Sequence, residues 1–492
     1  MASGFFLFFK GNLPSKIFSE EAPKTNNVVI DSLLLEAIEE AHPDNSIEEK
    51  QVVESKEQDD KTNNDNVYYI DESDLVSNES ELSFKGMIYL ESFYAKLFEL
   101  EQSKAKRVRI GYYGDSMTDG DMIVQDLRKN YQNKYSGGGV GYVPITVESA
   151  KSRGSVVHRY SPNWKVQSYL NVKKPIKPFG VSGQVFFVKD TVKDTWVSLQ
   201  AGNIKNMTSL HTPTLYFGSS DNTKGKVSVI IGKDTIVKSL NASAELNRLK
   251  LADGSIRQIK VMFQHADSIP IYGIDVSANT GVQVDNFSSR GNSGLPLSLL
   301  KVSLMQKFQR NLDYSLIVLH YGTNVLNYGS YNYSWYTKQM NRVVSHLKQC
   351  FPNASILVIS TADKGTKYDL TMKTDSAVLP LVKAQRKYAM ESHTGFFNLY
   401  EAMGGEGSMV KWVEESPVKA NKDYTHFNFK GAQEVSNLIF ERLESGYADY
   451  KNKKEATLKV EVKKRADSIK KVEEEKALNT NVLDTIKKHD KE

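Results

Sequence analysis

A serine in a turn after a predicted strand is the first residue of this chain whose position suggests chemistry. Residues 108–116 read V-R-I-G-Y-Y-G-D-S, so a strand-like apolar and aromatic run ends in Gly114, Asp115 and Ser116. The helix-like run Met122 to Tyr131 follows. In open α/β folds, ligands bind at the carboxyl ends of the strands, where helix starts offer free N–H groups. Ser116 is therefore a candidate nucleophile, although an ordinary helix-capping serine has the same local sequence.

A nucleophilic serine needs a base, and His426 has an acid at a suitable spacing. Asp423 precedes it by three residues in D-Y-T-H, just before the helix-like run Gly431 to Leu443. On one loop, the carboxylate can hold the imidazole in a single tautomer, as in a Ser-His-Asp triad. The alternative is a polar loop that caps the following helix.

Two further segments could supply donors for an oxyanion. The run Ser315 to His320 is continuously apolar in its middle, which is typical of a buried parallel strand, and it leads into Y-G-T-N, which ends in Asn324. A second β-like run, Gly281 to Val284, precedes a polar loop that contains Gly291. A glycine there lets a backbone N–H approach a ligand closely.

These four blocks come in the order of the four sequence blocks of the SGNH (GDSL-type) hydrolases, which the chain resembles. The matching residues are Gly114-Asp115-Ser116, Gly291, Gly322-Thr323-Asn324 and Asp423-x-x-His426. Two residues depart from the family pattern. Met117 replaces the usual Leu, which is a tolerable apolar exchange, and Val325 stands where the third block usually has Asp.

The resemblance implies a role for each of these residues. Ser116 would be the nucleophile, His426 the base, and Asp423 the residue that orients His426. The oxyanion hole would consist of the backbone N–H groups of Ser116 and Gly291 and the side chain of Asn324. The departure at residue 325 puts the support of Asn324 in doubt, but not Asn324 itself.

A narrower resemblance covers residues 85–443. The segments G-D-S-M-T-D-G-D-M-I-V-Q-D-L-R and G-G-G-V-G-Y-V-P-I are similar to periplasmic or membrane-anchored SGNH proteins of Bacteroidetes-type bacteria. Those proteins are related to peptidoglycan and polysaccharide O-acetylesterases and O-acetyltransferases. The resemblance implies an acetylated glycan as substrate, an acyl-serine intermediate and no cofactor or metal. It leaves room for a membrane-bound acyltransferase as a partner.

The segments that must position these residues show two different patterns of predicted secondary structure. After Gly294, helix-like and strand-like runs alternate, which indicates a parallel sheet with helices on both faces. Between Thr146 and Thr280, short β-like runs are separated by turn signals, which is typical of an antiparallel β-sandwich. We therefore expect an α/β fold. It would be an SGNH (flavodoxin-like) three-layer sandwich with a parallel sheet, interrupted by an inserted antiparallel β-sandwich domain.

The expected organisation has six segments. They are a remnant of a signal anchor (1–18), a disordered acidic tether (19–83), the first half of the SGNH domain (84–145), the inserted β-domain (146–280), the second half of the SGNH domain (281–446) and a charged C-terminal helix (447–492). The apolar run G-F-F-L-F-F near the N-terminus is too short to span a bilayer, for which about 20 residues are needed. As the stub of an anchor, it predicts a periplasmic or cell-envelope location, with inner-membrane anchoring.

Composition excludes some classes of function. A net charge of +5 over 492 residues, without a compact basic patch, gives little support for nucleic-acid binding. The single cysteine, Cys350, rules out an intrachain disulfide, and no Cys/His cluster has metal-ligand spacing. In the insert, four aromatic residues could stack on sugars or form core, and core is favoured. They are Trp164, Tyr169, Trp196 and Tyr216.

Two functions from different classes remain. The first is a serine esterase or acyltransferase that acts on O-acetyl esters of cell-surface carbohydrate, either peptidoglycan or exopolysaccharide. The alternative is a catalytically inactive carbohydrate-binding or scaffold protein of the cell envelope. The complete set of matching site residues favours the enzyme.

Overall fold

A five-stranded parallel sheet forms the centre of the computed structural model, which describes residues 31–41, 79–189, 194–326 and 331–489. Its strand order is β15-β1-β16-β17-β20, and every pairing is parallel. The strands are buried almost throughout because helices cover both faces. Their bounds are β1 Arg107–Gly114, β15 Gly281–Ser288, β16 Tyr314–His320, β17 Ser355–Ile359 and β20 Gly395–Phe397.

Each face of the sheet has its own apolar core, because successive side chains of a strand point to opposite faces. On β1, Tyr112 packs with α3, α4, α9 and α10, whereas Tyr113 packs with α5, α6 and α7. The helices of the first face are α3 Glu91–Glu101, α4 Val124–Tyr135, α9 Ser408–Glu414 and α10 Phe429–His489. Those of the second face are α5 Val302–Leu312, α6 Ser334–Cys350 and α7 Val378–Glu391.

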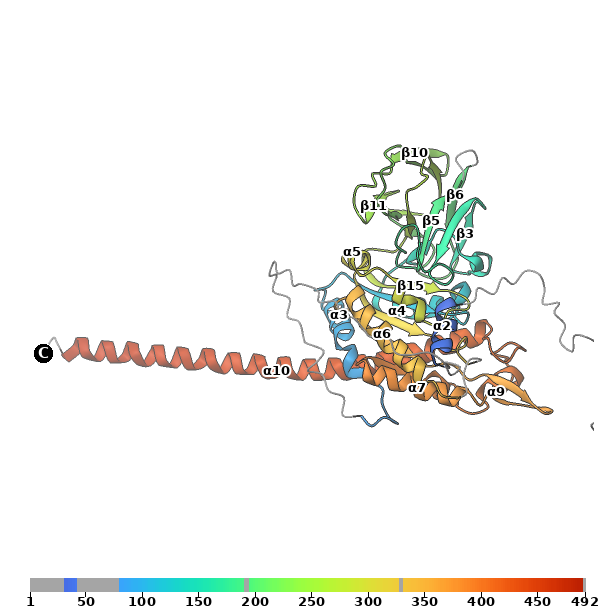
Figure 1. Cartoon of the computed structure of the whole chain (residues 1–492). Coiled ribbons are helices and arrows are strands. Elements are labelled where there is room, and N and C mark those ends of the chain that lie inside the picture. Colours follow the sequence, from blue (N-terminus) through green and yellow to red (C-terminus); the bar gives the residue numbers. More distant parts are fainter. Residues whose placement is uncertain (1–30, 42–78, 190–193, 327–330, 490–492) are drawn as a thin grey trace, which may run out of the picture.

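An antiparallel β-domain is inserted between β1 and β15 and stands beside the β15 edge (Figure 1). One of its sheets has the order β10-β9-β13-β6-β3, and the other has the order β11-β8-β14-β5-β4, with β2 paired to β14. Alternate side chains of both sheets share one core. The bounds are β2 Tyr142–Pro144, β3 Val156–Tyr160, β4 Trp164–Ser168, β5 Gln184–Val188, β6 Thr195–Ala201, β8 Thr214–Phe217, β9 Lys226–Ile231, β10 Asp234–Ser239, β11 Asn247–Lys250, β13 Gln258–Gln264 and β14 Ile271–Asp275. The expected fold class is thus confirmed.

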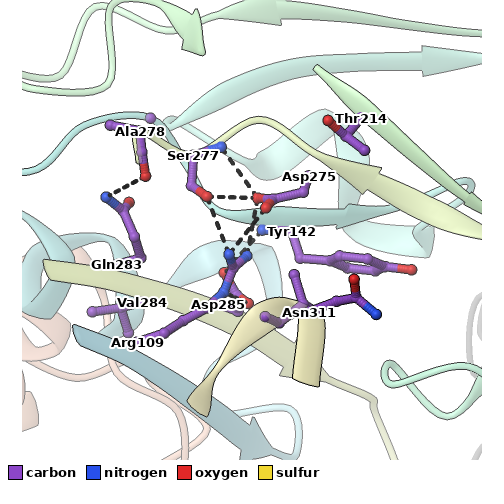
Figure 2. A network of polar contacts seen from close by, with 12 residues as sticks. Arg109, Tyr142, Thr214, Asp275, Ser277, Ala278, Gln283, Val284, Asp285 and Asn311 are labelled. Atoms are coloured by element: carbon purple, nitrogen blue, oxygen red, sulfur yellow. Dashed lines mark hydrogen bonds and ion pairs between the residues drawn. The ribbon is translucent and has the colours of Figure 1, made fainter. Parts of the chain in front are cut away.

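A buried charge network joins the insert to the parallel sheet (Figure 2). The guanidinium of Arg109 on β1 donates to Asp285 on β15 at 2.7 and 3.0 Å and to Asp275 on β14 at 3.0 Å twice. Burial alone would lower the pKa of Arg109, but the two carboxylates outweigh it and raise the pKa. Tyr314 donates its hydroxyl to Asp285 at 2.7 Å, and Ser277 accepts from Arg109 at 3.2 Å. The network therefore fixes β14 against β1 and β15.

Aromatic side chains complete this junction. The ring of Phe308 on α5 lies 6.3 Å from Tyr142, 5.8 Å from Tyr216 and 5.6 Å from Tyr272, all three from the insert. These rings belong to the same core as the helices of the second face. The insert is therefore packed as part of the body and does not swing on a linker.

The N-terminal region differs from the expectation. The predicted anchor remnant (1–18) and most of the predicted tether lie outside the described residues, but Ser32–Ala41 forms helix α2. Leu34 and Ala37 of α2 are buried in the core of the second face, with α6 and the 3-10 helix η5 (Leu295–Leu299) as neighbours. A disordered tether is therefore the wrong description for this stretch. The apolar residues between 30 and 38 by themselves predict a short helix within the acidic segment, and α2 confirms it.

The C-terminal helix also differs. Residues 447–492 do not start a separate helix, because α10 runs without a break from Phe429 to His489 and projects from the body (Figure 1). Its packed part ends near Lys451, where Glu101 accepts from Tyr447 at 2.8 Å and from Lys451 at 2.6 Å. No helix within the described ranges is both long and apolar enough to span a bilayer.

Candidate active site

The carboxyl ends of three adjacent strands deliver the candidate residues to one edge of the sheet. Gly114, the last residue of β1, pairs with Ser288 on β15 and with His320 on β16. Ser116 follows β1, the loop with Gly291 follows β15, and Asn324 follows β16. Strand order therefore brings together blocks that are far apart in the sequence.

Ser116, His426 and Asp423 form one continuous hydrogen-bonded chain. Oγ of Ser116 lies 2.9 Å from Nε2 of His426, and Nδ1 of His426 lies 2.8 Å from Oδ2 of Asp423. A carboxylate only accepts, so Nδ1 carries the proton and Nε2 is free to accept from the serine hydroxyl. Burial alone would raise the pKa of Asp423, but the hydrogen bonds from His426 and Thr425 outweigh it and lower the pKa. The arrangement suits a serine activated by a neutral imidazole.

The loop that carries the acid and the base is held by its own backbone. Oδ1 of Asp423 accepts from the backbone N–H of Thr425 at 3.0 Å and of His426 at 2.9 Å. Asn421 donates its N–H to the carbonyl of His426 at 2.8 Å, and Tyr424 takes a left-handed φ of 53°. The D-x-x-H spacing thus produces a tight turn in which the carboxylate meets both the N–H and the ring of one histidine.

The nucleophile turn depends on two small or polar neighbours of Ser116. A Cβ on residue 114 would lie 2.2 Å from Oγ1 of Thr118, so only glycine fits there. Asp115 is buried, and its Oδ1 accepts from the N–H of Met117 at 2.9 Å. Burial raises the pKa of Asp115 to about 6. Both residues shape the turn from which the hydroxyl of Ser116 reaches His426.

Two of the three candidate oxyanion donors, Gly291 and Asn324, lie on loops that touch each other. Nδ2 of Asn324 donates to the carbonyl of Asn292 at 3.1 Å, and Gly291 has a left-handed φ of 78° in the turn just before Asn292. An amide carries two N–H groups, so Asn324 retains one after this bond. The departure at Val325 leaves Asn324 supported, because the Asn292 carbonyl holds its side chain.

Several residues around the site were not foreseen from the sequence. Asn292 and Ser293 are buried beside Gly291, and they are held by Tyr169 of the insert and by Asp31 before α2. Arg290 pairs with Asp119 at the rim. No local pattern distinguishes these residues, because each acts through a partner that is remote in the sequence.

A cleft of about 250 Å³ lies between the insert and the nucleophile region. Residues 119–121 and 286–290 line it from the parallel-sheet side, and residues of the insert such as Glu148, Asn171 and Gln184 line it from the other. The lining combines apolar surface with carboxylate, amide and hydroxyl side chains that can donate or accept hydrogen bonds.

The aromatic residues of the insert are mostly core. Trp164, Tyr169 and Tyr216 are buried, and only Trp196 is partly open, with Nζ of Lys260 4.6 Å from its ring centre. The core role favoured from the sequence is therefore confirmed for the first three. Within the described part of the chain, no group of three or more His, Cys, Asp or Glu side chains is placed to hold a metal ion.

Comparison with known proteins identifies solved structures with a similar fold. The sequence matches no family model and no curated protein. A solved structure described as a peptidoglycan O-acetylesterase in action superposes with a TM-score of 0.60 at 20% identity, over 73% of this chain and 96% of that one. A family two carbohydrate esterase from Cellvibrio japonicus is more distant, with a TM-score of 0.25 at 11% identity over 60% of this chain and 99% of that one.

The first of these structures shows the fold, because its similarity extends over nearly its whole length. The chain therefore shares its fold with this solved structure, which confirms the expected fold class. Membership of the SGNH (GDSL-type) superfamily stays a prediction.

Proposed function

We propose that this protein is an SGNH-type serine esterase that removes O-acetyl groups from cell-surface carbohydrate through an acyl-Ser116 intermediate. The observation that carries the proposal is the unbroken chain from Ser116 through His426 to Asp423. The alternative, a catalytically inactive carbohydrate-binding or scaffold protein, would not require this hydrogen-bonded chain.

The mechanism follows from the geometry. His426 Nε2 takes the proton of the Ser116 hydroxyl while Oγ attacks the acetyl carbonyl. The tetrahedral intermediate collapses, the C–O bond to the sugar breaks, and His426 returns the proton to the sugar oxygen. Water then attacks the acetyl-serine with His426 again as base, and acetate leaves. Asp423 keeps the imidazole in the required tautomer and stabilises its charged form.

The oxyanion would be bound by the backbone N–H groups of Ser116 and Gly291 and by the side chain of Asn324. Support comes from the adjacency of β15, β1 and β16 and from the bond between Asn324 and the loop of Gly291. Such donors act on the charge that develops in the transition state, which makes them a large contributor to rate.

The proposed substrate class is an acetylated glycan of the cell envelope, peptidoglycan first. Support comes from the solved structure described as a peptidoglycan O-acetylesterase, which this chain matches over 96% of that structure's length. The cleft between the insert and residues 119–121 offers carboxylate, amide and hydroxyl side chains that suit sugar hydroxyl and amide groups. This substrate implies an envelope location, which we include in the proposal together with anchoring through the N-terminal segment.

The same acyl-serine could pass its acetyl group to a sugar hydroxyl instead of water. The protein would then be an O-acetyltransferase, and a membrane-bound acyltransferase would be a fitting source of acetyl groups. The half-exposed His426 and Asp423 favour access of water, so we place hydrolysis first.

The test compares acetate release by the purified full chain from acetylated peptidoglycan and from acetylated polysaccharide. Each reaction is run with and without an added sugar acceptor. We expect acetate from peptidoglycan without a transfer product, and loss of this acetate release in Ser116→Ala. Transfer without free acetate would replace the esterase by the transferase, and acetate release that persists in Ser116→Ala would contradict the proposal.

A further inference from the structure

The loop that carries Gly291 receives its support from outside the parallel sheet. We call residues 289–294 the Asn292 loop. The loop is joined to the sheet at its first residue, where the backbone N–H of Ser289 donates a hydrogen bond to the carbonyl of Gly114 at 3.0 Å. Beyond that bond, Asn292 and Ser293 are fully buried, and side chains from other regions of the chain hold them.

These side chains come from three separate regions. Nδ2 of Asn292 donates to the hydroxyl of Tyr169 in the insert at 3.1 Å. The hydroxyl of Tyr336 on α6 donates to the carbonyl of Ser293 at 2.7 Å. Oδ2 of Asp31 accepts from the N–H of Ser293 at 3.0 Å and from its hydroxyl. The only carboxylate among these partners is therefore supplied by the segment that precedes α2.

One carboxylate performs two tasks at Asp31. While Oδ2 binds Ser293, Oδ1 accepts from the backbone N–H groups of Leu33 and Leu34 at 3.1 Å each, and so caps the first turn of α2. Asp31 is 1% exposed, and this burial raises its pKa. Removing a carboxylate from water is costly, so these four hydrogen bonds must offset that cost for the helix to stay docked.

The rest of α2 anchors the contact at two further places. Leu34 and Ala37 pack into the core beside α6 and η5, and Glu36 pairs with Lys173 of the insert. Helix α2 thus touches the parallel-sheet domain and the insert at the point where both meet the Asn292 loop.

From this geometry we propose that α2 positions the proposed oxyanion hole, and that Asp31 is the positioning residue through which it acts. Asp31 holds Ser293, two residues after Gly291, while Asn324 holds the carbonyl of Asn292 between them. The inference rests on the proposed function. It adds that an N-terminal element, outside the matched sequence blocks, sets the efficiency of the transition-state donors.

This placement predicts an effect on kcat. The oxyanion forms only on the way to the tetrahedral intermediate. A displaced donor therefore stabilises the transition state less and leaves the stability of the Michaelis complex unchanged. Loss of a whole donor costs roughly 10²–10³ in rate, and a loosened loop should cost less, about tenfold. A substrate contact would instead raise KM.

The test uses Asp31→Asn in the full chain. Asn has nearly the same shape and still caps a helix, but its amide nitrogen cannot accept from Ser293. We expect kcat for a chromogenic acetyl ester to fall about tenfold with KM within about twofold, and labelling of Ser116 by a fluorophosphonate to slow by a similar factor. Hydrogen exchange at the Ser293 amide should quicken, while amides of β16 stay unchanged. Leu35→Ala, a change at an exposed side chain of α2 outside the core, is the matched control and should resemble wild type.

A second variant covers the case in which Asp31→Asn does not fold. Leu34→Ala loosens the same helix through packing, without touching the Asn292 loop, and should lower kcat in the same way. Faster exchange at Ser293 with unchanged kcat would overturn the inference, and so would a change in KM alone. In both cases the esterase would survive. A wild-type chain that neither turns over esters nor reacts with the fluorophosphonate would remove the proposed function and the inference together.

Discussion

At the scale of single residues, the central fact is a contact between groups 310 positions apart in the chain. Ser116 and His426 meet at 2.9 Å because their loops open at the same edge of the sheet. Asp423 is only three residues from His426, so one tight turn brings its carboxylate to the imidazole and little additional backbone has to be ordered. The chemistry thus needs one long-range contact and one local turn.

Removal of either partner of the long-range contact should abolish turnover. We expect Ser116→Ala and His426→Ala each to lower kcat by several orders of magnitude, because triad residues act as a unit and single losses in subtilisin reach about 10⁶. Thermal melting should stay near that of wild type, since neither side chain belongs to an apolar core. Near-normal turnover of acetyl esters by either purified variant would disprove the triad.

Asn324 tests the oxyanion hole separately. Asn324→Ala should lower kcat by roughly 10²–10³ with little change in KM, because its amide is proposed to bind charge that exists only beyond the ground state. Steady-state kinetics on a chromogenic acetyl ester supply both constants. If KM alone rises, Asn324 is a contact for the bound substrate, and other groups must form the oxyanion hole.

At the scale of elements, the segment after the nucleophile is held by a buried ion pair. Asp121, in the 3-10 helix η3 (Asp119–Asp121), accepts from Arg128 on α4 at 2.8 and 3.1 Å and from Asn286 on β15 at 3.1 Å. Arg153 of the insert lies 3.5 Å away. Burial alone would raise the pKa of Asp121, but the two arginines outweigh it and hold the pKa well below its ordinary value of 3.8.

This ion pair predicts an acid-dependent stability. A depressed pKa in the folded state means that the ionised form stabilises folding above the unfolded-state pKa, and that this contribution is lost as the pH falls toward the folded-state pKa. At pH 7, Asp121→Asn should lower the free energy of unfolding by about 3–5 kcal/mol, since it leaves a buried arginine without its full partner. Urea unfolding should show this difference narrowing below about pH 4. A difference that is constant with pH would contradict the ion-pair explanation.

At the scale of the whole molecule, the insert packs as part of the same body as the parallel sheet. The Arg109 network and the Phe308 cluster bury the junction, so excision of the insert would leave charges and aromatic rings uncovered (Figure 2). A deletion is therefore a poor test of substrate binding, and a change within the cleft is a better one.

Asn171→Trp offers that test because residue 171 is exposed and lines the cleft on the insert side. A bulky ring there should raise KM for acetylated peptidoglycan several-fold and leave a small chromogenic ester unaffected. Lys233→Trp, an exposed turn residue between β9 and β10, provides the control for added surface tryptophan. Equal activity of both variants on the polymer would show that the cleft does not hold glycan.

Much of this architecture was open to prediction because it depends on local patterns. Continuous apolar runs predicted β1, β16 and β17, and alternation with turn signals predicted the inserted sheets. Boundaries were less accurate. The apolar spacing from Leu297 to Gln309 predicts a single helix, but the structure has η5, then a break at Leu300 and Lys301, and then α5. Pro296 suits the first turn of η5, and the extended backbone at Leu300 ends that helix early.

The sequence by itself determined which residue types stand at which strand ends, since strand periodicity and the D-x-x-H turn are local properties of the chain. Only the tertiary structure decided the partners of buried polar groups. Asp31 meets Ser293 across 262 positions, and Asn292 meets Tyr169 across 123. Nothing sets Asp31 apart within an acidic segment, because the composition of that segment is that of a solvated tether. Its burial is set by the surface that α6, η5 and the insert build together, and that surface exists only once the chain has folded.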